Sequence, residues 1–130
     1  MLKIRQISLS RVIWIDPGIH NKENHKYRLR LEDEFNTIGF SYATSIEIAV
    51  SQINSTVKTV LIASGQMGKI LMPRIHHLEN VLVVLVFCFK TDDHEKWAKD
   101  FTKIKGVTNS FEEALKVSKK LLSNVMKNQA

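Results

Sequence analysis

Short runs of β-branched and other apolar residues alternate along the chain with segments in which apolar residues recur every three or four positions. The runs are nearly continuous, as in strands whose two faces are both covered by helices. The recurring segments have the spacing of amphipathic helices. The predicted strands are residues 11–16, 40–43, 57–63, 81–89 and 104–108.

Five strand–helix units follow one another without an internal repeat or a linker. Connections of this kind are right-handed and produce a parallel sheet with helices on both faces. We therefore expect an α/β fold with three αβα layers and a five-stranded parallel sheet. The flavodoxin-like or receiver-like strand order 2-1-3-4-5 is the natural choice. Residues 81–89 form the most hydrophobic run and are expected at the centre of the sheet.

Capping residues and apolar stripes indicate where the helices lie. Tyr27, Leu31 and Phe35 form one stripe on a charged first helix. Pro73 lies within the expected helix 69–78, so a kink or a break is predicted there. The residues placed to cap helices are Asn21, Thr44 with Glu47, Asp92 or Asp93, and Ser110 with Glu113.

The 130 residues correspond to one domain that can bury a core without disulfides or metals. We expect a single receiver-like domain over residues 1–130, with its core at about 11–122. Residues 1–10 would add an N-terminal arm or an edge strand, and residues 126–130 would be a frayed tail.

Composition narrows the cellular compartment and the classes of partner. Cys88 is the only cysteine, which excludes a disulfide framework and favours the cytoplasm. No secretory signal is evident, and the longest apolar run is far shorter than the ~20 residues of a membrane span. The net charge of +6 would suit nucleic acid, but the lysines are dispersed and alternate with acids over 92–105. We therefore expect neither a nucleic-acid partner nor a membrane.

A ligand site on this fold would lie at the carboxyl ends of strands one and three, where the strand order reverses. Ser64-Gly65-x-x-Gly68 leads there from a strand into a helix, and free N–H groups at such a start can receive a phosphate. The alternative is a tight turn that requires glycine. The candidate ligand-binding residues are Asp16, Ser64, Gly65, Gln66, Gly68, Lys69 and Arg74.

Several familiar chemistries lack their motifs. The Ser64–Gly68 stretch is not a P-loop, and the chain has no GxGxxG, HExxH, CxxC or GxSxG motif. His76 and His77 are adjacent and would point about 100° apart on a helix, which does not suit a shared metal. We expect no catalytic residue, no metal and no cofactor.

The layout resembles the receiver domains of response regulators. Those domains carry an acidic pair after the first strand, a phosphoacceptor aspartate ending the third, Ser or Thr ending the fourth and lysine ending the fifth. Here Asp16 is a single acid, Ser64 stands at the acceptor position, Thr91 is displaced, and Thr108 or Asn109 replaces the lysine. The resemblance implies a pseudo-receiver that is not phosphorylated.

The chain also resembles a module at the N-terminus of eukaryotic multidomain proteins that is abundant in bdelloid rotifers. There it precedes ADP-ribosyltransferase domains or tetratricopeptide repeats. The similar stretches are residues 12–16, 60–68, 72–78 and 95–107, and the sequence Pro-Arg-Ile-His-His-Leu is the most distinctive part. This resemblance implies an accessory domain and assigns no site residue.

These observations favour a non-catalytic regulatory or protein-interaction module over an enzyme. Its partner would be another protein, a neighbouring domain or a second copy, at the face that includes Trp97 and residues 99–105. One alternative is a sensor of a nucleotide or another phosphate-bearing ligand at Ser64–Gly68. The other is an enzyme that processes a nucleotide or NAD, for which Glu23 and Glu47 are the early helical carboxylates.

Overall fold

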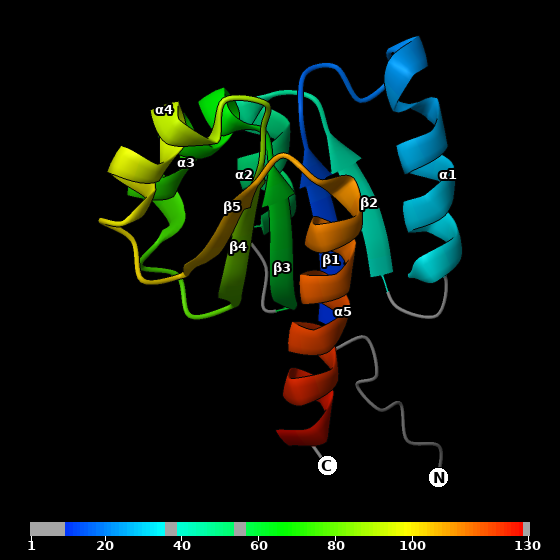
Figure 1. Cartoon of the computed structure of the whole chain (residues 1–130). Coiled ribbons are helices and arrows are strands. Elements are labelled where there is room, and N and C mark those ends of the chain that lie inside the picture. Colours follow the sequence, from blue (N-terminus) through cyan, green and yellow to red (C-terminus); the bar gives the residue numbers. More distant parts are fainter. Residues whose placement is uncertain (1–9, 36–38, 54–56, 129–130) are drawn as a thin grey trace, which may run out of the picture.

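A computed structural model describes residues 10–35, 39–53 and 57–128 (Figure 1). The strands are β1 (Ser10–Ile15), β2 (Gly39–Ala43), β3 (Lys58–Ala63), β4 (Val81–Phe87) and β5 (Ile104–Thr108). The helices are α1 (His25–Glu34), α2 (Ile46–Ile53), α3 (Gly65–Ile75), α4 (Thr91–Ala98) and α5 (Phe111–Asn128), and a 3-10 turn over Lys22–Asn24 precedes α1.

The strands form one all-parallel sheet in the order β2-β1-β3-β4-β5, which confirms the predicted three-layer flavodoxin-like fold. The expectation that residues 81–89 form the central strand is wrong, because β3 occupies the centre and β4 lies beside it. β4 also ends at Phe87, where its last register partner is Thr108. β5 begins and ends at the residues expected from the sequence.

Two hydrophobic clusters, one on each face of the sheet, pack its strands against the two helical layers. One cluster joins buried side chains of α2 and α3, with partly buried side chains of α4, to one face of the sheet. The other joins α1 and α5 to the opposite face. Because successive side chains of a strand point to opposite faces, Ile13 and Ile15 enter the first cluster while Val12 and Trp14 enter the second. All four are buried, as expected of a strand covered on both sides.

The helix caps agree with the sequence in part. The Ser110 hydroxyl accepts a hydrogen bond from the Glu113 N–H at 3.1 Å, as predicted. Ser45, not Thr44, supplies the cap of α2 by accepting from the Ile48 N–H at 3.2 Å.

Two further expectations about caps fail. Asn21 precedes the 3-10 turn without a side-chain capping bond. α4 begins at Thr91, two or three residues earlier than a cap at Asp92 or Asp93 would place it, so both aspartates lie within its first turn. Carboxylates there are favourable beside the partial positive charge of a helix start.

Pro73 does not break the third helix. α3 runs as one element from Gly65 to Ile75 and includes the proline in its last turn. The predicted break is therefore wrong, and the helix ends before Leu78. Proline has no N–H to donate to the carbonyl four residues earlier, that of Lys69, so the helix continues past Pro73 without this one hydrogen bond.

The ends of the chain are described only in part. The predicted arm or edge strand lies at residues 1–10, of which the structure describes only Ser10, at the start of β1. α5 continues to Asn128, so it extends past Val125, and the last two positions of the predicted tail lie outside the described residues.

Candidate functional site

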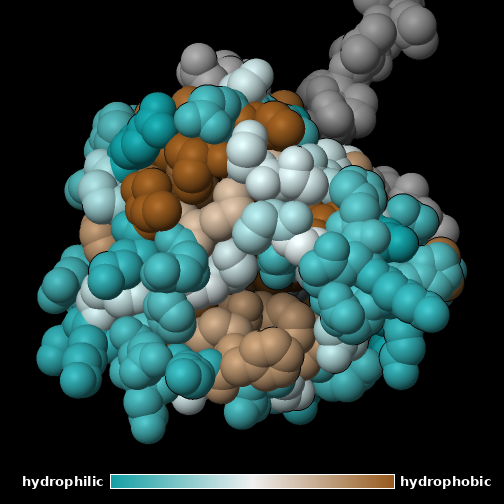
Figure 2. All heavy atoms as spheres, turned by 90° about the horizontal axis from the view of Figure 1, so that it is seen from above, coloured by the Kyte–Doolittle hydropathy of each residue, from teal (hydrophilic) through white to brown (hydrophobic). Residues whose placement is uncertain are grey.

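Asp16 and Ser64 lie side by side at the carboxyl ends of β1 and β3, as the sequence predicts. The last register pair of these strands is Ile15 with Ala63, and the Ser64 N–H donates to the Ile15 carbonyl at 2.9 Å. Figure 2 views the molecule from above, onto this carboxyl edge. The edge is not uniformly polar, because hydrophobic surface gathers over α2 and α3 and again near the start of α5 (Figure 2).

The carboxylate of Asp16 is bonded within its own loop. Its Oδ1 accepts from the Gly18 N–H at 2.7 Å, and its main-chain N–H donates to the Ala43 carbonyl at 3.0 Å. The Asn24 side chain, at the end of the 3-10 turn, holds the loop by donating to the Gly18 carbonyl at 2.6 Å. The guanidinium of Arg28 also donates to the Ile19 carbonyl. Asp16 thus stabilises a loop that is already fastened to α1.

Burial raises the pKa of Asp16 above its ordinary value, and the hydrogen bond from Gly18 only partly opposes this. A carboxyl whose pKa is higher in the folded chain than in the unfolded chain binds more protons when folded. Stability then falls as pH rises through the interval between the two pKa values.

We therefore expect Asp16→Asn to raise the free energy of unfolding at neutral pH, because the amide keeps an acceptor for Gly18 without a buried charge. At pH values below both pKa values the variant should show no such gain. Urea unfolding at several pH values measures this difference. A variant that is less stable than the parent at neutral pH would contradict it and would show that the charge itself is needed.

Ser64 acts as the N-cap of α3. Its hydroxyl accepts from the Met67 N–H at 3.4 Å, and its carbonyl accepts from the Gly68 N–H at 2.8 Å. The helix starts at Gly65, so the interpretation of Ser64–Gly68 as a glycine-requiring turn before a later helix is wrong. Neither Gly65 nor Gly68 has a positive φ. The reason for these glycines must lie in what packs against them.

α4 packs directly on the two glycines. A Cβ at Gly65 would lie 2.5 Å from Cδ2 and 2.6 Å from Cε1 of His94, and closer still to its Nε2. A Cβ at Gly68 would lie 3.3 Å from Cη2 of Trp97. The two rings are joined, because Trp97 Nε1 donates to His94 Nδ1 at 2.9 Å. The glycines therefore permit close approach of α4 to the start of α3.

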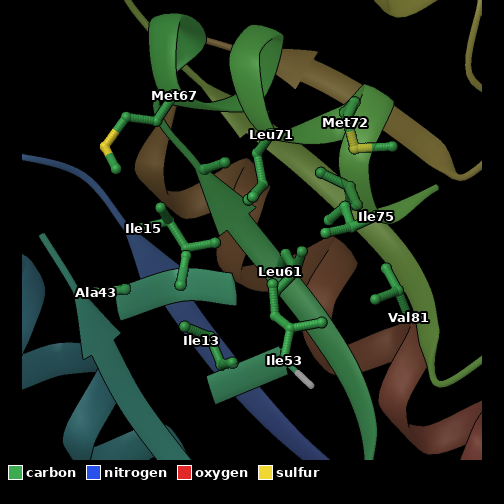
Figure 3. Close-up of a cluster of buried hydrophobic side chains, with 13 residues drawn as sticks. Ile13, Ile15, Ala43, Ile53, Leu61, Met67, Leu71, Met72, Ile75 and Val81 are labelled. Carbon is green, nitrogen blue, oxygen red and sulfur yellow. The ribbon is translucent and has the colours of Figure 1, made fainter. Parts of the chain in front are cut away.

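The remaining candidates do not converge on this edge. Gln66, Lys69 and Arg74 are exposed, whereas the opposite side of α3 carries Met67, Leu71, Met72 and Ile75 into the core (Figure 3). Arg74 lies ten residues after Ser64, about 15 Å along a helix. It cannot supply charge to a ligand at the helix start. The structure brings together Asp16, Ser64 and Gly65 and leaves the two cations apart from them.

The carboxyl ends of β4 and β5 do not carry the Ser or Thr and the lysine of a receiver site. Thr91 opens α4, and the Thr108 hydroxyl accepts from the Ser110 N–H at 3.0 Å, so it is used in the loop before α5. Cys88 is half-buried, and its pKa is raised by burial first and then by the charges of Glu95 and Asp93. The thiol is therefore a poor nucleophile.

Phe89 departs most from the sequence reading, which placed it in a buried strand. It follows the end of β4 and is 93% exposed. Beneath this edge, Phe111 stacks on Tyr27 with ring centroids 4.3 Å apart, and Phe87 meets both rings edge-on. The sequence reading missed this aromatic cluster because Tyr27, Phe87 and Phe111 come from three different elements.

The described part of the chain holds no group of three or more His, Cys, Asp or Glu side chains placed to bind a metal ion. His76 and His77 have ring centroids 6.0 Å apart, and His76 packs against Phe101. Within the same residues, no helix combines the length and apolar character that crossing a bilayer requires.

Comparisons with protein-family models, with curated proteins and with solved structures find no match to this chain. The fold class follows from its own sheet order and layers.

Proposed function

We propose that the chain is a non-catalytic regulatory and protein-interaction module, with a degenerate receiver-type site, that acts in cytoplasmic signalling. The observation that carries this proposal is the packing of His94 on Gly65. It places an imidazole ring against Gly65, the first residue of α3, at the helix start that a phosphate-bearing ligand of this fold would approach. A covered helix start supports an interaction role over a nucleotide sensor or a nucleotide-processing enzyme.

The polar groups at this edge support the same choice. The Asp16 carboxylate accepts from its own loop, and the Ser64 hydroxyl caps α3. Lys69 and Arg74 lie on the exposed side of the helix. Of these four candidates, the two at the helix start already serve the fold, and the two cations lie away from it.

The exposed side chain of Phe89 supports an interaction surface at this end of the sheet. An aromatic ring that is 93% exposed contributes little to folding, whereas aromatic side chains are enriched among the residues that dominate protein–protein binding. It follows Phe87 by two residues, and Phe87 belongs to the aromatic cluster with Tyr27 and Phe111. We propose that this edge meets a partner protein, a neighbouring domain or a second copy.

Thermal unfolding with a ligand panel tests the non-catalytic half of the proposal. The panel contains nucleotides, NAD, ADP-ribose, inorganic phosphate, and magnesium with a phosphoryl mimic. A ligand at a hundred times its dissociation constant would add about 2.7 kcal/mol. In a domain of this size that would raise the midpoint by roughly 8–16 °C.

We expect no member of the panel to shift the midpoint. A shift of this size, abolished by Gly65→Val or Gly68→Val in a variant that still folds, would overturn the proposal in favour of a sensor. Turnover of NAD or a nucleotide would overturn it in favour of an enzyme.

A further inference from the structure

The two edges of the sheet are not equivalent. At the β2 edge, the Asp16 N–H donates to the Ala43 carbonyl, so the preceding carbonyl, on Tyr42, points away from β1. Nε2 of Gln52, on α2, donates to that Tyr42 carbonyl at 2.9 Å. The Ser41 hydroxyl donates to Oε1 of the same Gln52 side chain at 2.9 Å. A side chain of the domain therefore occupies part of the β2 edge.

The β5 edge has no such cover. The Cys88 N–H donates to the Thr108 carbonyl at 3.0 Å, so the preceding carbonyl, on Val107, points to the outer side of the sheet. β5 pairs with β4 alone among the described strands (Figure 1). No described side chain bonds the outer edge of Ile104–Thr108 in the way that Gln52 bonds β2. Main-chain groups at this edge are available to another chain.

A groove runs beside this open edge, between α4 and β5. It has a volume of about 430 Å³, and its lining residues are Glu95, Ala98, Lys99, Ile104, Lys105, Gly106 and Val107. Ala98 is buried, and Ile104 and Val107 are half-buried, which gives the groove an apolar floor. Three charged side chains form its rim. An extended segment lying on β5 could therefore place alternate side chains over apolar surface.

The rim favours an acidic occupant. Lys99 and Lys105 are exposed and outnumber the single carboxylate of Glu95. Within the described part of the chain neither lysine has an ion-pair partner. The nearby Lys103 is already used, because its ammonium donates to the Leu78 carbonyl at 2.5 Å. Two ammonium groups are thus free to pair with carboxylates of another chain.

A second copy is the less suitable occupant. Edge-to-edge pairing of two β5 strands would bring Lys105 of one chain to the same short edge as Lys105 of the other. Like charges facing each other across strands are destabilising. The net charge of +6 adds a repulsion between copies that an acidic partner would convert into attraction.

We propose that β5 is a docking edge for an extended acidic segment of a partner protein, which pairs with Ile104–Thr108 as a sixth strand. Its main chain would bond the outer edge, alternate apolar side chains would enter the groove, and its acidic side chains would face Lys99 and Lys105. This inference rests on the proposed interaction function and specifies its partner.

A titration with synthetic peptides tests this proposal. The probe is a labelled peptide of alternating glutamate and valine, and the matched control replaces glutamate by lysine. We expect the acidic peptide to bind and to shift the backbone amide resonances of Ile104–Thr108. Methylating alternate backbone nitrogens of the peptide should weaken binding more than about ten-fold, because main-chain bonds are lost while charge is kept.

Two charge-reversal variants locate the site. Lys105→Glu should weaken binding about five-fold, whereas Lys120→Glu, an equal charge change on an exposed position of α5, should have little effect. Several results would overturn the proposal. These are no binding of the acidic peptide, equal binding of both peptides, equal effects of both variants, no effect of methylation, or shifts confined to β2.

Failure here can be separated from failure of the proposed function. If the peptides fail while the ligand panel still shows no shift, the docking edge is wrong and the interaction module stands. If the panel shows a bound nucleotide or phosphate, the proposed function itself is wrong.

Discussion

Phe111→Ala is expected to lower the free energy of unfolding by about 3 kcal/mol, the largest effect among the changes considered for this domain. Phe111 is buried at the first turn of α5, stacks on Tyr27 at 4.3 Å and meets Phe87 at 5.9 Å. Truncation removes both ring contacts. It leaves a cavity between α1, β4 and α5, the elements that carry the three rings. Urea unfolding should show a lower midpoint with an unchanged slope.

The matched control is Phe89→Ala, at the same edge of the sheet. Phe89 is 93% exposed, so its loss should change stability by less than about 0.5 kcal/mol. This contrast separates an aromatic residue that supports the fold from one that is available to a partner. Equal destabilisation by the two substitutions would mean that Phe89 packs in solution and would remove it as an interaction residue.

Gly65→Ala is expected to cost about 1–3 kcal/mol, because the new methyl group would overlap the His94 ring. The ring cannot simply rotate away without breaking the bond from Trp97 Nε1 to His94 Nδ1. Gly68→Ala should cost less, since its nearest contact, Cη2 of Trp97, would be 3.3 Å away.

The sign should reverse when the ring is removed. A His94→Ala background removes the three nearest contacts of the new methyl group, all of which lie on the His94 ring, and the φ of Gly65 is not positive. Alanine is then the better helix former by up to about 1 kcal/mol, so the same substitution should stabilise. Equal loss of stability in both backgrounds would show that His94 does not rest on Gly65, and it would remove the main support for a covered helix start.

The sheet could be predicted from the sequence because its signals are local. Near-continuous apolar runs mark strands covered on both faces, and β5 matched its predicted bounds at both ends. The cap at Ser110 could also be predicted, because a serine three residues before Glu113 has the spacing of a capping box. The sequence does not show which of two adjacent hydroxyl residues, Thr44 or Ser45, caps α2, because both stand next to the helix start.

The position of Phe89 could not be predicted from the same kind of signal. The apolar run from Val81 continues to it without interruption, so hydrophobicity alone does not show where the strand ends. The end is set by pairing, because Phe87 with Thr108 is the last register pair of β4 and β5. Hydrophobicity therefore predicts a buried side chain at Phe89, where the structure has an exposed one.

The role of the glycines was missed for a different reason. The backbone freedom of glycine, from which the sequence predicts a turn at Gly65 and Gly68, is a property of the local chain. Their surroundings come from His94 and Trp97, about thirty residues later, which pack on them through the tertiary structure. A single sequence contains both partners but gives no sign that they meet.

The most direct test of the covered helix start is a titration of the labelled protein with ATP and magnesium, followed through its backbone amide resonances. We expect the amide resonances of Gly65 and Gln66 to stay unmoved, because the His94 ring packs against Gly65 at the start of α3. Saturable shifts of these amides at micromolar nucleotide would contradict it, and the domain would then have to be regarded as a sensor.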